Sequence, residues 1–89
     1  MMFEWNAEKA RINVKKHRVS FDEAMTAFAD PRSLTIPDPA HSIDEDRFVL
    51  LGRSDQGRLL VVVHVERGEN VRIISARRAT RTESSVYEA

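Results

Sequence analysis

The amino-acid sequence predicts an α+β fold with a short N-terminal strand, two helices, an antiparallel β-meander and a short C-terminal helix. Two segments begin with a capping box, in which a Ser or Thr that marks a helix N-terminus is followed three residues later by Glu. Three strand-like stretches rich in β-branched residues are separated by short turns that contain Gly, which is the pattern of consecutive antiparallel strands. With 89 residues and no dividing linker, we expect one domain over residues 1–89.

The first part of the chain is predicted to form a strand and two helices. Phe3-Glu4-Trp5 is the strand, and Asn6 is the expected N-cap of a helix from Ala7 to His17. Ser20-Phe21-Asp22-Glu23 is the capping box of the second helix, which Asp30-Pro31 ends. Its apolar side chains recur at the spacing of a buried stripe: Phe21, Ala24, Met25 and Phe28.

The second part of the chain is predicted to be mostly strand. The four predicted strands are Ser33 to Ile36, Arg47 to Arg53, Arg58 to Glu66 and Val71 to Arg77. Between the first two lies a polar, acidic loop over residues 37–46, and the last strand leads into a helix from Thr82 to Glu88. In the central strand Leu59, Val61, Val63 and Val65 share one face, which we expect to pack on the helices, while Leu60, Val62, His64 and Glu66 share the other.

The composition fits a soluble globular protein with a marked charge asymmetry. Residues 1–46 carry a net charge of −3, whereas residues 47–83 carry +4, and every basic residue of the second segment is Arg. Arginine suits planar, bidentate contact with phosphate or carboxylate groups. No apolar run approaches the roughly 18 residues of a membrane span, no signal peptide begins the chain, and Cys is absent, so a cytoplasmic protein without a membrane association is expected.

The passage from the last strand into the C-terminal helix is the most informative stretch for chemistry. Thr80 and Glu83 form its capping box, and Arg77, Arg78 and Arg81 are predicted to converge there, beside the free N–H groups of a helix N-terminus. This arrangement suits a ligand that carries phosphate. Because side chains alternate along a strand, Arg77 and Arg78 are expected to leave on opposite faces and to differ in role.

Cleavage of RNA requires few kinds of group: one that takes a proton from the 2′-hydroxyl, one that stabilises the phosphorane and one that protonates the leaving oxygen. Arginine can supply the second, and His64 could transfer a proton if it lies near Arg77. Glu23 is a further candidate base, although its place in a capping box already explains it. Carboxylates of the 37–46 loop lack the spacing of a metal site, so neither a metal nor another cofactor is expected.

An ordered set of short motifs resembles the BrnT toxins over nearly the whole chain. These motifs are Phe3-Glu4-Trp5, Asn13 with Lys16-His17 and Val19-Ser20-Phe21, Arg47-Phe48, Leu60-Val61-Val62-Val63, Ile74-Ser75-Ala76-Arg77, Ala79-Thr80, Glu83 and Tyr87. The resemblance implies a toxin of a type II toxin–antitoxin pair with a compact fold like that of the RelE ribonucleases. It also implies arrest of translation by RNA cleavage, and neutralisation by a cognate BrnA-like antitoxin that binds operator DNA and represses the operon.

The resemblance also directs attention to particular residues. Arg77 matches the motif whose arginines are associated with toxicity, and Arg67 follows by its place in the preceding turn. Trp5 and Glu23 occupy positions that the pattern includes. We therefore take Arg77, Arg67, His64 and Glu23 as candidate catalytic residues, and we take as candidate RNA-binding residues Arg78, Arg81, Trp5 and Lys16.

Two departures from the family pattern and two alternative functions remain. Arg18 replaces the glycine that is common after the histidine, and Ser84-Ser85 stands where charged residues are usual.

The lack of a defined acid–base pair favours a non-catalytic protein-binding module acting in a DNA-bound autoregulatory complex. A nucleic-acid binder that uses phosphate contacts alone is a third reading, and an exposed sheet edge could receive an antitoxin strand.

Overall fold

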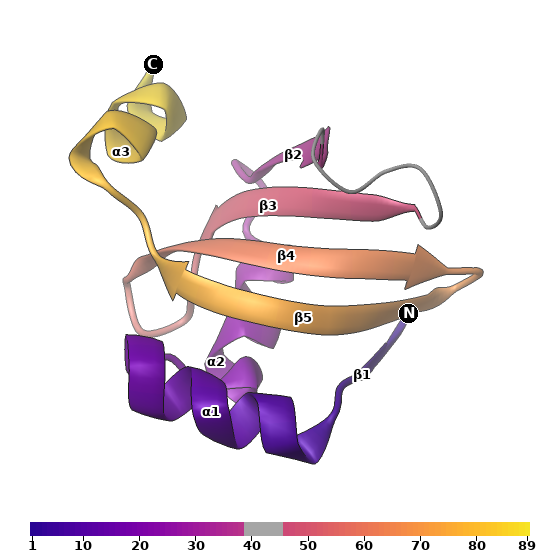
Figure 1. The fold of residues 1–89 in the computed structure, drawn as a ribbon. Coiled ribbons are helices and arrows are strands. Elements are labelled where there is room, and N and C mark those ends of the chain that lie inside the picture. The colour runs from indigo at the N-terminus through magenta and orange to yellow at the C-terminus, as the bar shows by residue number, and fades with distance from the viewer. Residues whose placement is uncertain (39–45) are drawn as a thin grey trace.

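The computed structural model describes residues 1–38 and 46–89, and it has the predicted α+β architecture (Figure 1). The elements are β1 (Met2–Glu4), α1 (Ala7–His17), α2 (Phe21–Thr26), the short 3-10 helix η1 (Ala27–Ala29), β2 (Leu34–Pro37), β3 (Arg47–Arg53), β4 (Leu59–Arg67), β5 (Asn70–Arg78) and α3 (Arg81–Glu88). Each predicted element is present, with ends shifted by at most a few residues. The predicted acidic loop falls largely outside the described residues.

All five strands form one sheet in the order β1-β5-β4-β3-β2. β3, β4 and β5 form the predicted antiparallel meander, and β2 is antiparallel to β3. The meander turns at Gly57 and Gly68, whose positive φ angles of 80° and 62° other residues adopt only with strain. The pairing of β1 with β5 is parallel, so the first and the last strand of the chain lie side by side at one edge of the sheet.

The two faces of the sheet differ in what covers them. In Figure 1, α1 and α2 lie on one side of the sheet and α3 lies on the other. We call these the inner face and the outer face. The inner face holds the core, in which Phe21 and Ala24 of α2 pack against side chains of the three central strands. Those strand residues are Leu50, Leu60, Val62, Ile73 and Ala76.

The prediction for the faces of β4 was wrong. Leu60, Val62 and His64 are buried on the inner face, and Val61 points to the outer face beside α3. Both faces of this strand are apolar, so alternation alone could not show which one meets the helices. An irregularity in the pairing with β5 at Val63 and His64 further adjusts the register near the polar end of the strand.

The predicted buried stripe of the second helix is confirmed, but the helix changes its winding along it. The hydroxyl of Ser20 caps α2 by accepting a bond from the N–H of Glu23 at 3.0 Å. Phe21 and Ala24 are buried, and Met25 and Phe28 pack against the core from the edge. Phe28 lies in η1, where the chain tightens before Asp30-Pro31 ends the helical segment.

The side-chain amide of Asn13 fastens α1 to the sheet. Asn13 is 6% exposed, and its Oδ1 accepts a bond from the N–H of Ala76 at 3.1 Å while its Nδ2 donates to the carbonyl oxygen of Ala76 at 2.8 Å. Nδ2 also donates to the carbonyl oxygen of Val19 at 2.9 Å. β1 pairs with β5 only as far as Arg72, so the amide replaces a neighbouring strand at Ala76.

Replacing Asn13 with Ala should lower the free energy of unfolding by about 2–3 kcal/mol, because backbone groups of Ala76 and Val19 would lose their partners in a buried place. Urea unfolding followed by circular dichroism measures this change. Lys15→Ala, at an exposed site of the same helix, is the control and should change stability by less than about 0.5 kcal/mol. Equal stability of the two variants would contradict the role given to Asn13.

Arg18 ends α1 in the left-handed conformation, with φ 60° and ψ 31°. Its N–H donates to the carbonyl oxygen of Val14 at 2.9 Å, so this residue forms the C-terminal cap. Glycine is the usual residue in such a cap because a Cβ atom is strained there. The departure from the family pattern therefore falls at the one position of this helix that favours glycine for a physical reason.

Arg18→Gly should stabilise the protein by about 1 kcal/mol, because it removes the strain of a left-handed residue with a Cβ atom. The expected rise in melting temperature is about 4–8 °C for a domain of this size. Arg18→Ala is the matched control, since it removes the same charge but keeps the strain. If Ala and Gly raised the melting temperature equally, charge and not backbone strain would be the cause.

Of the helices in the described part of the chain, none is both long and apolar enough to cross a membrane.

Candidate functional site

Arg77 lies on the outer face at the junction of β5 and α3. It is the partner of Val61 in the sheet, and Val61 points to the same side as Glu83 of α3. Nη1 and Nη2 of Arg77 donate to the two carboxylate oxygens of Glu83 at 2.9 Å and 2.8 Å. The Arg77 side chain is still 42% exposed. The result is a fixed, bidentate ion pair with an open side.

The carboxylate of Glu83 also completes the predicted capping box of α3. Oε1 accepts a bond from the N–H of Thr80 at 2.8 Å, and the N–H of Glu83 donates to the Thr80 hydroxyl at 3.2 Å. These bonds to the ionised form, with that of Arg77 foremost, lower the pKa of Glu83 to about 2. Glu83 therefore stays charged at neutral pH and orients the guanidinium, and its carboxylate is a weak base.

Arg78 and Arg81 do not join Arg77 at one point. Arg78 is opposite Leu60, a core residue, so it leaves β5 on the inner side, where its charge contributes to lowering the pKa of Glu23. Arg81 is exposed at the first position of α3. The expectation of opposite faces for Arg77 and Arg78 is confirmed, and the expectation that all three guanidiniums converge is wrong.

Arg67 is remote from Arg77. Arg67 is the last residue of β4 and pairs with Asn70, the first residue of β5. Arg77 is the penultimate residue of β5 and so lies near the other end of that strand. Seven residues of β-strand span about 23 Å. The structure therefore does not bring these two candidate catalytic arginines to one site.

His64 is enclosed in the inner core and is 1% exposed. Its ring lies edge-on to Phe28, with centroids 4.8 Å apart, and stacks on Phe48 at 5.9 Å. Burial lowers the pKa of His64 and keeps the ring neutral at physiological pH. The prediction of proton transfer depended on proximity to Arg77, and that condition is not met because the two side chains lie on opposite faces.

Glu23 is also buried, as the centre of a polar clamp on the inner side. Both its oxygens accept bonds from Arg58, with Nε at 2.9 Å from Oε2, and the Ser54 hydroxyl donates to Oε2 at 2.7 Å. Arg58 also donates to the carbonyl oxygen of Arg18 at 3.1 Å. The hydrogen bonds from Arg58 are the main cause of the lowered pKa of Glu23. The clamp joins both helices to the turn between β3 and β4.

The remaining predicted RNA-binding residues occupy different surroundings. Trp5 is partly buried against the core, with its ring edge-on to Phe21 at a centroid distance of 5.9 Å. Lys16 is exposed on α1 and lines a shallow groove with Lys9 and Ser75. No cluster of three acidic or histidine side chains that could hold a metal ion occurs within residues 1–38 and 46–89.

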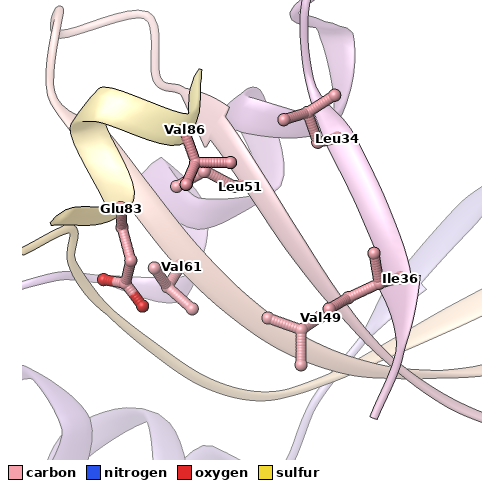
Figure 2. A pocket seen from close by; sticks show the side chains of 7 residues that line it. All are labelled: Leu34, Ile36, Val49, Leu51, Val61, Glu83 and Val86. Carbon is pink, nitrogen blue, oxygen red and sulfur yellow. The ribbon is translucent and has the colours of Figure 1, made fainter. Parts of the chain in front are cut away.

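A hollow between α3 and β2, which the sequence did not predict, shares Glu83 with the Arg77 ion pair. Figure 2 shows the side chains that surround it: Leu34, Ile36, Val49, Leu51, Val61, Glu83 and Val86. Its volume is about 210 Å³, and all of its lining except Glu83 is apolar. The alternation of Val49 and Leu51 in β3 was a usable signal, but it could not tell which of two apolar faces lacks helices.

A solved structure with the same fold places this architecture in a class. The chain is similar to the ribonuclease toxin BrnT of Brucella abortus, known from a crystal structure at 1.1 Å resolution, with a TM-score of 0.70 and 22% sequence identity. The superposition covers 91% of this chain and 100% of that one. At this identity the likeness shows a shared fold.

The sequence itself then gives the family. Residues 5–83 match the family described as the ribonuclease toxin, BrnT, of type II toxin–antitoxin systems. The chain belongs to the BrnT family, as the sequence motifs implied. No curated protein matches the chain significantly.

Stability should depend on pH through Glu83. Its pKa is lower in the folded than in the unfolded chain, so its contribution is complete above about pH 5 and declines as the pH falls toward 2. Glu83→Gln should cost about 1–2 kcal/mol at pH 7, after allowance for screening at this half-open site. Urea unfolding at pH 7 and pH 2.5 should show that difference shrinking in acid.

The matched control is Glu88→Gln, at an exposed position of the same helix. It should leave the pH dependence of the parent protein in place. A deficit of Glu83→Gln that stayed constant from pH 7 to pH 2.5 would contradict an ion pair between ionised Glu83 and Arg77.

Proposed function

We propose that this protein is an endoribonuclease toxin that needs no metal, arrests translation by cleaving RNA and acts through Arg77. The observation that carries the proposal is the bidentate Arg77–Glu83 pair on the exposed outer face of a chain of the ribonuclease toxin family. Arg77 is also the residue that matches the family motif at this junction.

The chemistry proposed for Arg77 is electrostatic. Cleavage by attack of the 2′-hydroxyl builds negative charge on the phosphorane oxygens, and a preorganised guanidinium stabilises that charge. Glu83 fixes the guanidinium in direction, so little reorganisation is needed when the phosphate arrives. The open side of Arg77 receives the phosphate, and Arg81, exposed at the first position of α3, contacts the RNA backbone beyond it.

The other candidate roles differ in how well their surroundings support them. Proton transfer by His64 or Glu23 stays a prediction that burial disfavours, because neither side chain is accessible to RNA on the outer face. Lys16 and Arg78 are exposed and fit contacts with the RNA backbone beyond the cleaved bond, whereas packing in the core accounts for Trp5. Arg67, at the end of β4 that is remote from Arg77, is assigned a role in holding the RNA.

The wider setting belongs to the same proposal. The partner is a cognate BrnA-like antitoxin that binds operator DNA, so the toxin reaches DNA only through it. The protein acts in the cytoplasm as a single domain over residues 1–89, and its fold is related to that of the RelE ribonucleases. Membership in a type II toxin–antitoxin family supports the existence of the antitoxin partner.

A second candidate function is a binding module without catalysis. It is favoured by one observation: the two candidate acid–base residues are buried on the face opposite Arg77. In that case Arg77 and Glu83 would serve only to hold α3 on the sheet. The two functions differ in whether the free protein changes the length of an RNA.

Arg77→Ala should lower RNA cleavage by at least about a hundredfold, because the stabilising charge at the phosphorane is lost. Purified, antitoxin-free protein is incubated with a defined messenger RNA in EDTA, with and without translating ribosomes, and the products are separated by length. Arg11→Ala, which breaks an exposed Arg–Glu pair on α1, is the control and should cleave like the parent.

Cleavage by Arg77→Ala at the parental rate would contradict the catalytic role proposed for Arg77. Intact RNA with the parent protein, shown to be folded by circular dichroism, would instead favour the binding module. Loss of cleavage in EDTA with recovery upon addition of Mg²⁺ would refute the independence from metal.

A further inference from the structure

The outer face of the sheet carries an apolar surface that the described chain leaves open. α3 covers only one end of it, and the side chains of Leu34, Ile36 and Val86 around the hollow are 43%, 58% and 56% exposed. In Figure 2 these side chains surround the space between β2 and α3, above Val49 of β3. Exposed aliphatic residues that line one hollow are typical of a docking site.

Positive charges frame this surface. In β3 the side chains directed outward are Arg47, Val49, Leu51 and Arg53, so two apolar residues lie between two arginines. Arg77 stands beside Val61 on the neighbouring side.

The apolar lining of the hollow and the arginines around it together indicate which kind of partner fits. The hollow has room for aliphatic side chains and offers almost no polar lining, which disfavours an RNA backbone. The arginines around the hollow favour a partner that carries carboxylates next to its aliphatic side chains. β2 is four residues long and ends in Pro37, which lacks an N–H, so its edge is poorly suited to adding a strand. A helix laid across the hollow meets all three conditions.

We propose that the hollow between α3 and β2 is the docking site for an amphipathic helix of the antitoxin, with apolar side chains spaced three and four residues apart and carboxylates on either side. This inference rests on the proposed function, because it takes the partner to be the cognate antitoxin. The helix inserts its apolar side chains among Leu34, Ile36 and Val86, and its carboxylates meet Arg47 and Arg53.

The hollow lies where an occupant would affect RNA cleavage. Glu83 lines the hollow and also holds Arg77, so a helix seated there touches the residue that orients the guanidinium. Docking keeps α3 on the sheet and brings the partner's bulk and negative charge beside the open side of Arg77. RNA is thereby excluded from Arg77, although the apolar contacts that hold the antitoxin lie outside the cleavage site.

The test measures binding of the cognate antitoxin and cleavage of RNA separately. Ile36→Asp and Val86→Asp each place a negative charge in the hollow and should raise the Kd for the antitoxin by about tenfold or more. Val14→Asp is the matched control, because Val14 is a helical valine that is 44% exposed on α1; its Kd should change by less than about twofold. Both hollow positions are exposed, so the variants are expected to fold, and circular dichroism verifies this.

Three results would overturn the proposal. Parental affinity of Ile36→Asp and Val86→Asp would show that the antitoxin docks elsewhere. Loss of RNA cleavage by these variants without antitoxin would assign the hollow to the RNA. Light scattering that showed a dimer of the free protein, dissociated by Ile36→Asp, would make a second copy of this chain the occupant. A parent protein that bound antitoxin but cleaved no RNA would refute the proposed function and leave the binding comparison valid.

Discussion

The hydrogen bonds between the Asn13 amide and Ala76 are the constraint on which the rest of the arrangement depends. β5 is an inner strand of the sheet at its first residues, where β1 pairs with it, but it would be an open edge at Ala76. The amide satisfies both backbone groups of Ala76 and thus holds α1 against the sheet. With Ala76 fixed toward the core, the next residue must point outward, and that residue is Arg77.

The two sides of the sheet then take different tasks, although each contains a buried or half-buried Arg–Glu pair. On the inner side Arg58 and Glu23 join the helices to the β3–β4 turn, together with Ser54. On the outer side Arg77 and Glu83 join β5 to α3, and Arg77 keeps an open side. The difference in burial, and not the chemistry of the pairs, makes the inner pair structural and the outer pair a candidate for function.

The proposed cleavage site and the proposed docking site share α3. Glu83 is directed toward Arg77, and Val86 one turn later borders the apolar hollow. Tyr87, in the same turn, fixes this helix because its hydroxyl donates a hydrogen bond to the carboxylate of Asp30 at 2.6 Å. Because α3 is short and held at both ends, occupation of the hollow by a partner can affect the orientation of Arg77 without any large movement of the sheet.

The sequence by itself determined the elements of this protein, because caps, turn glycines and apolar periodicity are local properties of the chain. It also determined the family and the position of Arg77, since those rest on ordered motifs. Only the tertiary structure decided which face of β4 meets the helices, because Leu60 and Val61 are equally apolar. It likewise decided that His64 and Glu23 are enclosed, that Arg67 is distant from Arg77 and that Glu83 lines a hollow. These depend on contacts between segments far apart in the chain, which no local pattern records.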